Sequence, residues 1–344
     1  MNISQALKNA YQKLNKKNIK SAHLDAELLL SFVLSRSREY ILAHSDEKLT
    51  AKQVAKFNNL IKQRTKNIPI AYLTSAKEFY ERKFYVDEKV LIPRPETELI
   101  INNALYHCEE SRRIRITKQP REDCNAHGIA TAYDLAMTVI DIGTGSGCII
   151  ITLARELQKN KNVKFFATDI SKNALAVANK NASLHKVSNK IKFLHGNLLE
   201  PMLKNKNFLL HTSNLLLLCN LPYLTPAQVK NSPSIKHEPK LALTAGTDGL
   251  KYYRELAKQI KQFCHCNPIP REGREEQSRQ KITLICEIDP KQTKGMKKIF
   301  SSIVIPVPQT ARGIPASPNQ GGQKKNIEIK KDLAGLPRLM IIKI

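Results

Sequence analysis

The chain has 344 residues, 42% of them hydrophobic, which is enough for a sizeable core and for more than one domain. The balance of 56 Lys and Arg against 30 Asp and Glu gives a formal charge of +26, which fits either an acidic partner or lysines spread over solvated faces. Seven cysteines without paired spacing argue against a disulfide framework, and no apolar run approaches the roughly 18 residues of a membrane span. We therefore expect reduced thiols, a cytoplasmic location and no membrane partner.

Helical patterns fill residues 1–75. Apolar residues recur at helical spacing from Leu7 to Leu14, and the segment SAHLDAELLLSFVL starts at Ser21, a residue type that caps helices. A third pattern opens with Thr50 and Gln53 in the spacing of a capping box and continues with apolar residues on one face. We predict a small helical domain over these residues.

The pattern changes at Glu78. The segment EFYERKFYVDEKVLIP alternates apolar and polar residues about a charged turn, which predicts a β-hairpin. The following IPRPETELI places two prolines ahead of another helix. We interpret residues 76–98 as a linker, in which Arg94 and Glu96 either brace an active-site wall or have a purely structural role.

Strands and helices alternate in residues 99–344, where MTVIDI, VKFFAT, IKFLH, LLLLC and ITLICEI have the composition of strands. This alternation predicts an α/β fold with a parallel sheet, helices on both faces and ligands at the carboxyl ends of the strands. Polar segments near residues 109–132, 265–280 and 306–325 are interpreted as loop insertions. The CHC string at residues 264–266 has no second group of ligand spacing, so we expect no metal.

The first of these strands leads into DIGTGSG, residues 141–147. Gly143, Gly145 and Gly147 let the backbone turn sharply into a helix and approach a ligand closely, with Thr144 and Ser146 between them. The dinucleotide fingerprint needs a glycine at position 148, where this chain has a cysteine, so NAD fits poorly. We predict that these five loop residues bind a different nucleoside cofactor.

Asp169 ends the second strand, where a carboxylate can accept both ribose hydroxyls of a nucleoside or cap the next helix. Neither Arg nor Lys flanks the glycine turn to take a phosphate, so we predict S-adenosyl-L-methionine, with its carboxylate at a helix N-terminus. The third strand ends at HGNLLE, where Asn197 or the backbone at Leu198 either contacts the adenine or forms an ordinary turn.

The fourth strand continues into Asn220, Leu221, Pro222 and Tyr223. The Asn220 side-chain oxygen and the Leu221 carbonyl could hold a planar NH₂ group with its lone pair aimed at a sulfonium methyl, and positioning of this kind supplies up to roughly 7–11 kcal/mol. Pro222 stiffens the corner, and Tyr223 would pack on the planar group. We therefore predict Asn220, Pro222 and Tyr223 as catalytic, Asn220 also beside the cofactor, and all four residues as substrate-binding.

This tetrapeptide after a fourth strand, with DIGTGSG upstream, resembles the amino-group N-methyltransferases. The segments SAHLDAELLL, VLIPRPETELI, EPKLALTAGTDGLKYYREL and KDLAGLPRLM resemble one branch over nearly the whole chain, the glutamine-N5 methyltransferases of peptide chain release factors. The resemblance implies a Rossmann-like, S-adenosyl-L-methionine-dependent domain and a helical N-terminal domain that docks the release factor. It implies methylation of the glutamine in the factor's Gly-Gly-Gln loop by a monomer that does not require nucleic acid.

Two positions depart from that family, which usually has proline where Leu221 stands and an acidic residue where Asn197 stands. Leu221 keeps the carbonyl acceptor but gives up rigidity, and Asn197 keeps an acceptor without the charge.

Asn-Leu-Pro-Tyr also occurs in adenine dimethyltransferases of ribosomal RNA. Together with the basic charge, this keeps open an adenine-N6 methyltransferase acting on RNA or DNA, although no base-reading module is evident. A non-catalytic binding protein is the third interpretation. The GGQ string at residues 321–323 is interpreted as coincidence.

Overall fold

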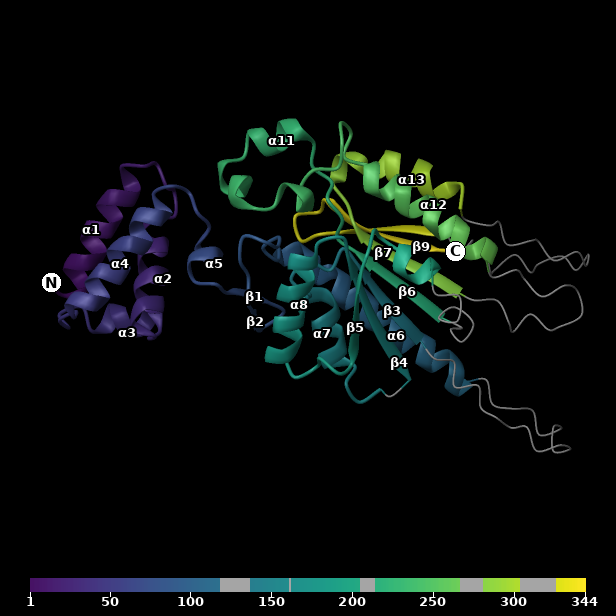
Figure 1. Cartoon of the computed structure of the whole chain (residues 1–344), viewed down its shortest axis with the longest axis horizontal. Helices are drawn as coiled ribbons and strands as arrows, with labels where there is room; N and C mark the ends of the chain where they lie inside the picture. The colour runs from purple at the N-terminus through teal and green to yellow at the C-terminus, as the bar shows by residue number, and fades with distance from the viewer. Residues whose placement is uncertain (118–136, 161, 205–213, 267–280, 304–325) are drawn as a thin grey trace, which may run out of the picture.

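The computed structural model describes residues 1–117, 137–160, 162–204, 214–266, 281–303 and 326–344. Figure 1 shows a helical bundle at one end and a larger part built around a central sheet at the other. The short helix α5 (Ile70–Leu73) and the hairpin of β1 (Lys77–Phe79) and β2 (Arg82–Phe84) lie between them. The predicted α/β class with a small N-terminal helical domain is confirmed.

The N-terminal bundle packs its helices around one core, and the helices are α1 (Ile3–Asn15), α2 (Ala22–Leu34), α3 (Arg38–Ala43) and α4 (Ala51–Arg64). Thr50 and Gln53 form the predicted capping box at the start of α4. The prediction at Ser21 is wrong in part, because this residue precedes α2 but its side chain accepts no capping hydrogen bond. Its ψ angle of 21° differs from the extended backbone that aims a capping oxygen at the helix.

The linker leads into a long helix. β1 and β2 pair antiparallel, as predicted, and a single 3₁₀ turn, η1 (Pro95–Thr97), then leads into α6 (Glu98–Thr117). The sequence analysis expected an irregular segment from residue 109, and this is wrong up to Thr117. No glycine or proline interrupts residues 98–119, so the helix that starts at Glu98 has no reason to stop earlier. The central parts of the three proposed insertions lie outside the described residues.

The central sheet has the strand order β5-β4-β3-β6-β7-β9-β8. The strands expected from the sequence are present and run parallel, namely β3 (Met137–Ile142), β4 (Val163–Asp169), β5 (Ile191–His195), β6 (Asn214–Cys219) and β7 (Lys281–Glu287). An antiparallel hairpin at one edge, made by β8 (Ile327–Lys331) and β9 (Pro337–Lys343), was not expected from the sequence. Its signal is weak because β8 alternates only two isoleucines with charged residues and β9 begins at a proline.

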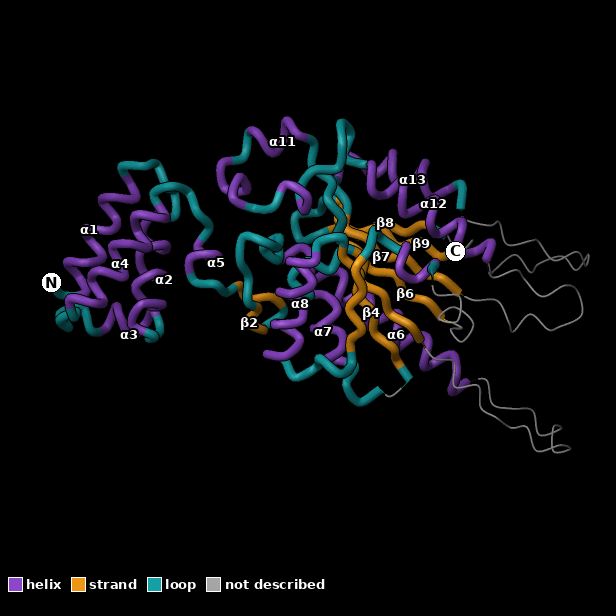
Figure 2. The backbone as a smooth tube through the Cα atoms, viewed as in Figure 1, coloured by secondary structure: helices purple, strands orange, loops and turns teal. Residues whose placement is uncertain are grey.

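Helices cover both faces of this sheet (Figure 2). Side chains alternate along a strand, so Leu216 and Leu218 of β6 pack on one side of the sheet and Leu215 and Leu217 on the other. The first face is covered by α6, α7 (Cys148–Glu156) and α8 (Lys172–Leu184). The second face is covered by α9 (Glu200–Leu203), α12 (Lys251–Cys266) and α13 (Thr293–Ser301).

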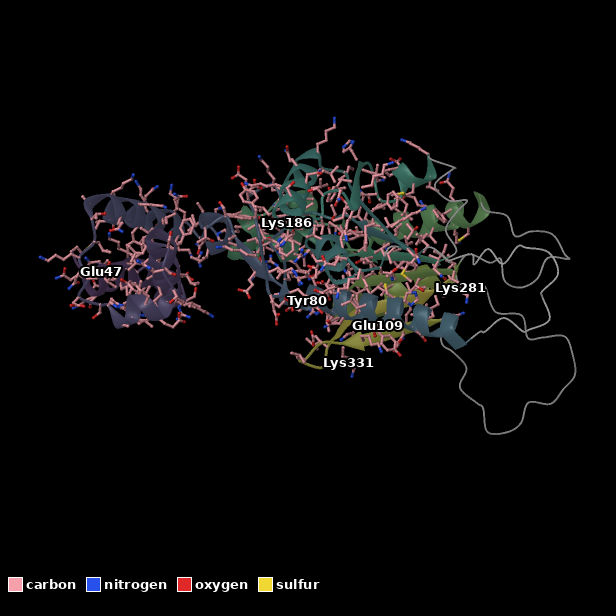
Figure 3. The ribbon with its side chains drawn as sticks, turned by 90° about the horizontal axis from the view of Figure 1, so that it is seen from below. Glu47, Tyr80, Glu109, Lys186, Lys281 and Lys331 are labelled. Carbon is pink, nitrogen blue, oxygen red and sulfur yellow. The ribbon has the colours of Figure 1, made fainter. Side chains whose placement is uncertain are left out.

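The remaining short elements follow β6 or precede α13, and they are α11 (Pro226–Lys230), η2 (Pro233–His237), η3 (Lys240–Ala242) and η5 (Pro290–Gln292). Charged side chains such as Glu47, Lys186, Lys281 and Lys331 are exposed on both parts of the molecule (Figure 3). Within the described ranges, no helix combines the length and the apolar character that crossing a bilayer requires.

The strand order defines where a ligand should bind. β3 pairs with β4 on one side and with β6 on the other, so the chain winds outward from β3 in both directions. In sheets of this kind, ligands bind at the carboxyl ends of the strands next to that reversal. The DIGTGSG loop follows β3 and Asn220 follows β6, which places both at this position.

Candidate active site

The loop after β3 turns sharply because its glycines adopt positive φ angles, with values of +55° at Gly145 and +81° at Gly147. A Cβ atom at Gly147 would lie 2.8 Å from Ile151 Cδ1 and 3.1 Å from Ala178 Cβ, so this position holds the loop against α7 and α8. A Cβ at Gly145 would meet nothing within 4 Å. The backbone at Gly145 therefore borders open space, as expected of a loop that receives a ligand.

Asp141 lies beneath this loop as a fully buried carboxyl group. Thr144 Oγ1 donates a hydrogen bond of 2.6 Å to its Oδ2, whereas its Oδ1 has no hydrogen-bond partner of ordinary geometry among the described residues. Burial raises the pKa of Asp141 to about 7, and the nearby charge of Asp169 contributes in the same direction. The Thr144 hydroxyl and the nearby Ile150 N–H both act to lower the pKa of this carboxyl group. A buried carboxylate oxygen without a partner is costly, so the ionised form of Asp141 would be favoured by a cationic group placed beside it. The sequence analysis assigned no role to this residue.

Asp169 is the last residue of β4 and contacts the same loop. Its Oδ2 accepts a hydrogen bond of 2.9 Å from the Gly145 N–H, and its Oδ1 accepts one of 2.8 Å from the Ser171 N–H. The helix α8 is capped by Ser171, which accepts from the Ala174 N–H, so the alternative interpretation of Asp169 as the helix cap is wrong. A carboxylate offers about four lone-pair directions, so two bonds leave Asp169 able to accept from further hydroxyls. Burial raises the pKa of this carboxyl group.

The loop after β5 is held in place by hydrogen bonds with Gln259, a residue of α12. Gln259 Oε1 accepts a hydrogen bond of 2.7 Å from the Leu199 N–H, and Gln259 Nε2 donates to the Asn197 carbonyl at 3.5 Å. Leu198 is buried and has a φ of +52°, which is unusual for a residue with a side chain. The Gly196 N–H donates to the Asp169 carbonyl, so this loop and the end of β4 are joined. Asn197, Leu198 and Asp169 therefore line the same edge of the sheet.

Asn220 directly follows β6, and the nitrogen of its carboxamide is held by a hydrogen bond. Its Nδ2 donates a hydrogen bond of 2.9 Å to Thr97 Oγ1, in the turn η1 that starts α6. No described residue donates to its Oδ1 or to the Leu221 carbonyl. Leu221 is itself buried, and a Cβ at Gly143 would lie 3.1 Å from its Cδ2, so the tip of β6 and the glycine loop are in contact. Two unused acceptors thus adjoin the loop after β3.

Tyr223 is held by a second buried carboxyl group. Its hydroxyl donates a hydrogen bond of 3.2 Å to Glu287 Oε1, and Thr97 Oγ1 donates one of 2.7 Å to Glu287 Oε2. Glu287 ends β7 and is 1% exposed, and burial raises its pKa. Burial and this carboxyl group both raise the pKa of Tyr223, so its hydroxyl stays protonated. Neither Thr97 nor Glu287 was expected from the sequence, because the hydrogen bonds of Thr97 to Asn220 and to Glu287 span 123 and 190 positions.

The backbone after Asn220 is also restrained. The Tyr223 carbonyl accepts a hydrogen bond of 2.8 Å from Gln292 Nε2, and Leu224 bridges to the segment before α12. Arg94 forms an ion pair of 2.5 Å with Glu238, whose other oxygen accepts from the Ile92 N–H at 3.0 Å. This ion pair joins the segment before α6 to the segment after α11, which both roles considered for Arg94 allow. Glu96 is exposed.

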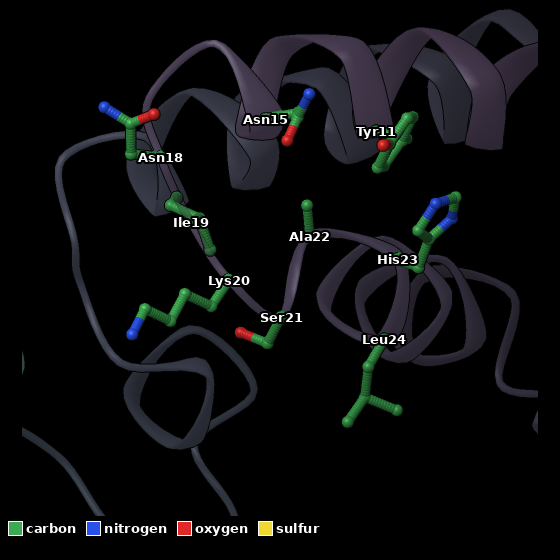
Figure 4. Close-up of a pocket in the computed structure, with 9 residues that line it drawn as sticks. All are labelled: Tyr11, Asn15, Asn18, Ile19, Lys20, Ser21, Ala22, His23 and Leu24. Atoms are coloured by element: carbon green, nitrogen blue, oxygen red, sulfur yellow. The ribbon is translucent and has the colours of Figure 1, made fainter.

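A separate groove of about 570 Å³ lies in the N-terminal bundle (Figure 4). The rings of Tyr11 and His23, which both line it, stack on each other with their centroids 3.7 Å apart. None of the residues predicted to bind cofactor or substrate lines this groove, which is formed by Tyr11, Asn15, Asn18, Ile19, Lys20, Ser21, Ala22, His23 and Leu24. The side chains of residues 265 and 266 in the CHC string and the GGQ string at 321–323 lie outside the described residues.

Comparisons with known proteins match two parts of the chain to known domain families. Residues 5–74 match the PrmC N-terminal domain, and residues 134–286 match a methyltransferase domain. The bifunctional methyltransferase of Rickettsia felis is 33% identical over 306 residues, which are 87% of this chain and 54% of that protein. The chain thus spans about half the length of such relatives.

A second group of relatives is matched over most of its length. The release factor glutamine methyltransferase of Dictyoglomus turgidum is 34% identical over 313 residues, which cover 88% of this chain and 94% of that protein. The protein of the same name from Bacillus anthracis is 35% identical over 236 residues, covering 68% of this chain and 73% of that protein. The chain therefore belongs to the release factor glutamine methyltransferase family.

Proposed function

We propose that this protein transfers a methyl group from S-adenosyl-L-methionine to the side-chain amide nitrogen of the glutamine in the Gly-Gly-Gln loop of peptide chain release factors. The observation that carries this proposal is the orientation of the Asn220 carboxamide. Its amide nitrogen is already bound to Thr97, so its oxygen is left to accept from an incoming N–H group. The Leu221 carbonyl next to it can accept the second N–H of the same NH₂ group.

The residues around the glycine loop fit the proposed methyl donor. The donor carries a ribose, for which Asp169 has acceptor capacity left. It also carries an ammonium group, whose charge would offset that of the ionised Asp141 carboxyl, in which Oδ1 lacks a partner among the described residues. The open space beside Gly145 leaves room for close approach. We assign the cofactor to this edge of the sheet, with contacts from Gly143, Thr144, Gly145, Ser146, Gly147, Asp169, Asn197, Leu198 and Asn220.

The chain's own contribution to the reaction is positioning. An amide nitrogen is a poor nucleophile because its lone pair is delocalised into the carbonyl. Two acceptors that take both N–H groups fix the plane of the substrate amide and direct its lone pair out of that plane, toward the electrophilic methyl that the bound donor supplies. Orientation of this kind accounts for up to roughly 7–11 kcal/mol of a barrier. The nitrogen becomes acidic only after methylation and then releases its extra proton to water, so no side chain needs to act as a general base before the transfer.

Pro222 and Tyr223 support this geometry. Pro222 has a fixed φ angle, and Gln292 restrains the Tyr223 carbonyl, so the Leu221 carbonyl cannot easily rotate away. The Tyr223 ring would pack against the planar amide, with its hydroxyl kept in place by Glu287. We assign the helical bundle of residues 1–75 to docking of the release factor. The protein would then act in the cytoplasm as a monomer, on a protein substrate and without nucleic acid.

Labelled methyl donor tests the proposal. The protein is incubated with a release factor, with the same factor carrying alanine in place of the loop glutamine, or with ribosomal RNA. Label should enter only the factor with glutamine. Asn220→Ala should lower the rate at least tenfold, because a lost acceptor costs on the order of 1–3 kcal/mol. Asn189→Ala, an exposed asparagine at the other end of the sheet, is the matched control. Label on RNA alone, or on neither substrate, would overturn the proposal.

A further inference from the structure

Asn220 and Glu287 end adjacent parallel strands in matching positions. β6 and β7 are paired with Cys219 opposite Cys286, so the next residues, Asn220 and Glu287, lie side by side at the edge of the sheet. Alternation places both on the face where Leu218 and Ile285 pack in the core with α6. Thr97, which immediately precedes α6, lies over this edge on the same face.

We propose that Glu287 and Thr97 are positioning residues that set which end of the Asn220 carboxamide faces the substrate. This proposal rests on the proposed function, in which the Asn220 oxygen must accept from the glutamine N–H. Both Glu287 oxygens accept hydrogen bonds from hydroxyls, and the single hydroxyl proton of Thr97 is directed at Oε2. Thr97 Oγ1 is then left with acceptor capacity alone, which matches Asn220 Nδ2 and not Oδ1.

One orientation of the Asn220 carboxamide is therefore preferred over the other. If the carboxamide were reversed, Asn220 Oδ1 would face Thr97 Oγ1, and two acceptors would oppose each other with no proton between them. Leaving a buried polar pair unsatisfied in this way favours the observed orientation by about tenfold to a hundredfold. The reversed side chain would present an NH₂ group to the glutamine NH₂ group, and two donors cannot bind each other. Glu287 thus acts on the reaction through Thr97 without touching the substrate.

Other groups face Glu287 and keep it in place. Arg338 of β9 lowers its pKa, Glu96 of η1 raises it, and the Tyr253 hydroxyl of α12 donates a hydrogen bond of 2.5 Å to its backbone carbonyl. Tyr223 donates to the carboxylate oxygen that Thr97 does not use. The carboxylate therefore receives two hydroxyl donors, one from Thr97, which binds Asn220, and one from Tyr223.

Exchange of the Asn220 side-chain amide protons tests the proposal without donor or substrate. Their NMR signal is identified in the ¹⁵N-labelled protein by its loss in Asn220→Ala, and the exchange rate with solvent is then compared among variants. Thr97→Val removes the hydroxyl at nearly constant volume and should speed the exchange at least tenfold. Thr97→Ser keeps the hydroxyl and should stay within about threefold of the original protein. Equal rates in Thr97→Val and the original protein would overturn the proposal.

The steady-state kinetics of glutamine methylation provide a second test of the proposal. Thr97→Val and Glu287→Gln should each lower kcat for glutamine methylation about tenfold or more, with the dissociation constant of the methyl donor changed less than threefold. In an Asn220→Ala background, Thr97→Val should cause no further loss, because its effect passes through Asn220. A full additional loss in that background would contradict the proposal. If no glutamine is methylated by the unmodified protein while the exchange rates change as expected, the proposed function fails and the orienting role of Thr97 stands.

Discussion

The affinity for the methyl donor should depend on pH through Asp141. Burial raises the pKa of this carboxyl group to about 7, and its Oδ1 has no partner among the described residues. A donor with an ammonium group favours the ionised form, so binding in the proposed site requires the proton to leave. Affinity should therefore increase as the pH rises through 7.

The magnitude follows from the ionised fraction. With a pKa of about 7, roughly one molecule in eleven carries the ionised carboxylate at pH 6 and roughly ten in eleven carry it at pH 8. The dissociation constant of the donor, or of its demethylated product, should thus be about tenfold lower at pH 8 than at pH 6.

The stability of the free protein should change in the opposite direction and decrease as the pH rises. The folded state holds the proton up to pH 7 and the unfolded chain only to about 4, so the free energy of unfolding falls across this interval.

Titration calorimetry with the demethylated product at pH 6, 7 and 8 measures the first effect. Asp141→Asn is the matched variant, and it should bind more weakly at pH 8 and lose most of the pH dependence. Its melting temperature at pH 8 should rise, because the variant no longer ionises a buried group. The same dissociation constant at pH 6 and pH 8, or an unchanged pH dependence in Asp141→Asn, would refute the role given to this carboxyl group.

Gly147→Ala should lower the free energy of unfolding by about 1–3 kcal/mol in urea titrations, because a φ of +81° strains a side chain and the new Cβ meets Ile151. Arg94→Met should cost about 2 kcal/mol, since it leaves the buried Glu238 without its cation, and adding Glu238→Gln should restore part of this loss. Leu221→Ala should cost about 2–4 kcal/mol, because its side chain is buried and contacts the glycine loop; an unchanged melting temperature would contradict that packing.

The parallel strands could be predicted because each is a short run of apolar residues between turn signals. The tips of β3, β4 and β6 were also predictable as a group, since carboxyl ends of parallel strands share one edge. The hairpin of β8 and β9 was not predictable in this way, because its alternation is short and charged. The extension of α6 to Thr117 was also not predicted, because the polar composition of this segment is typical of a loop. A polar segment without glycine or proline remains compatible with a helix.

The partners of the site residues could not be predicted. Thr97 and Glu287 are ordinary residues in the sequence, and they acquire meaning only when the register of β6 and β7 brings the ends of the two strands together. Asn220 could be selected from its own sequence context, but the direction of its carboxamide depends on a proton shared by two residues that lie 190 positions apart. Asp141 was visible in the sequence as the first residue of the DIGTGSG string, but its burial and the unpartnered oxygen Oδ1 became apparent only in the structure.

The place of β9 in the sheet has a consequence for the order in which the protein can assemble. β9 lies between β7 and β8, so β7 remains an open edge during synthesis until residues 337–343 leave the ribosome. Until then, the strand that carries Glu287 lacks half of its backbone partners and exposes an edge that could pair with other chains. A protein truncated before residue 326 should therefore aggregate and fail to organise the end of β7, although every residue of the glycine loop and of the Asn220 corner has already been made.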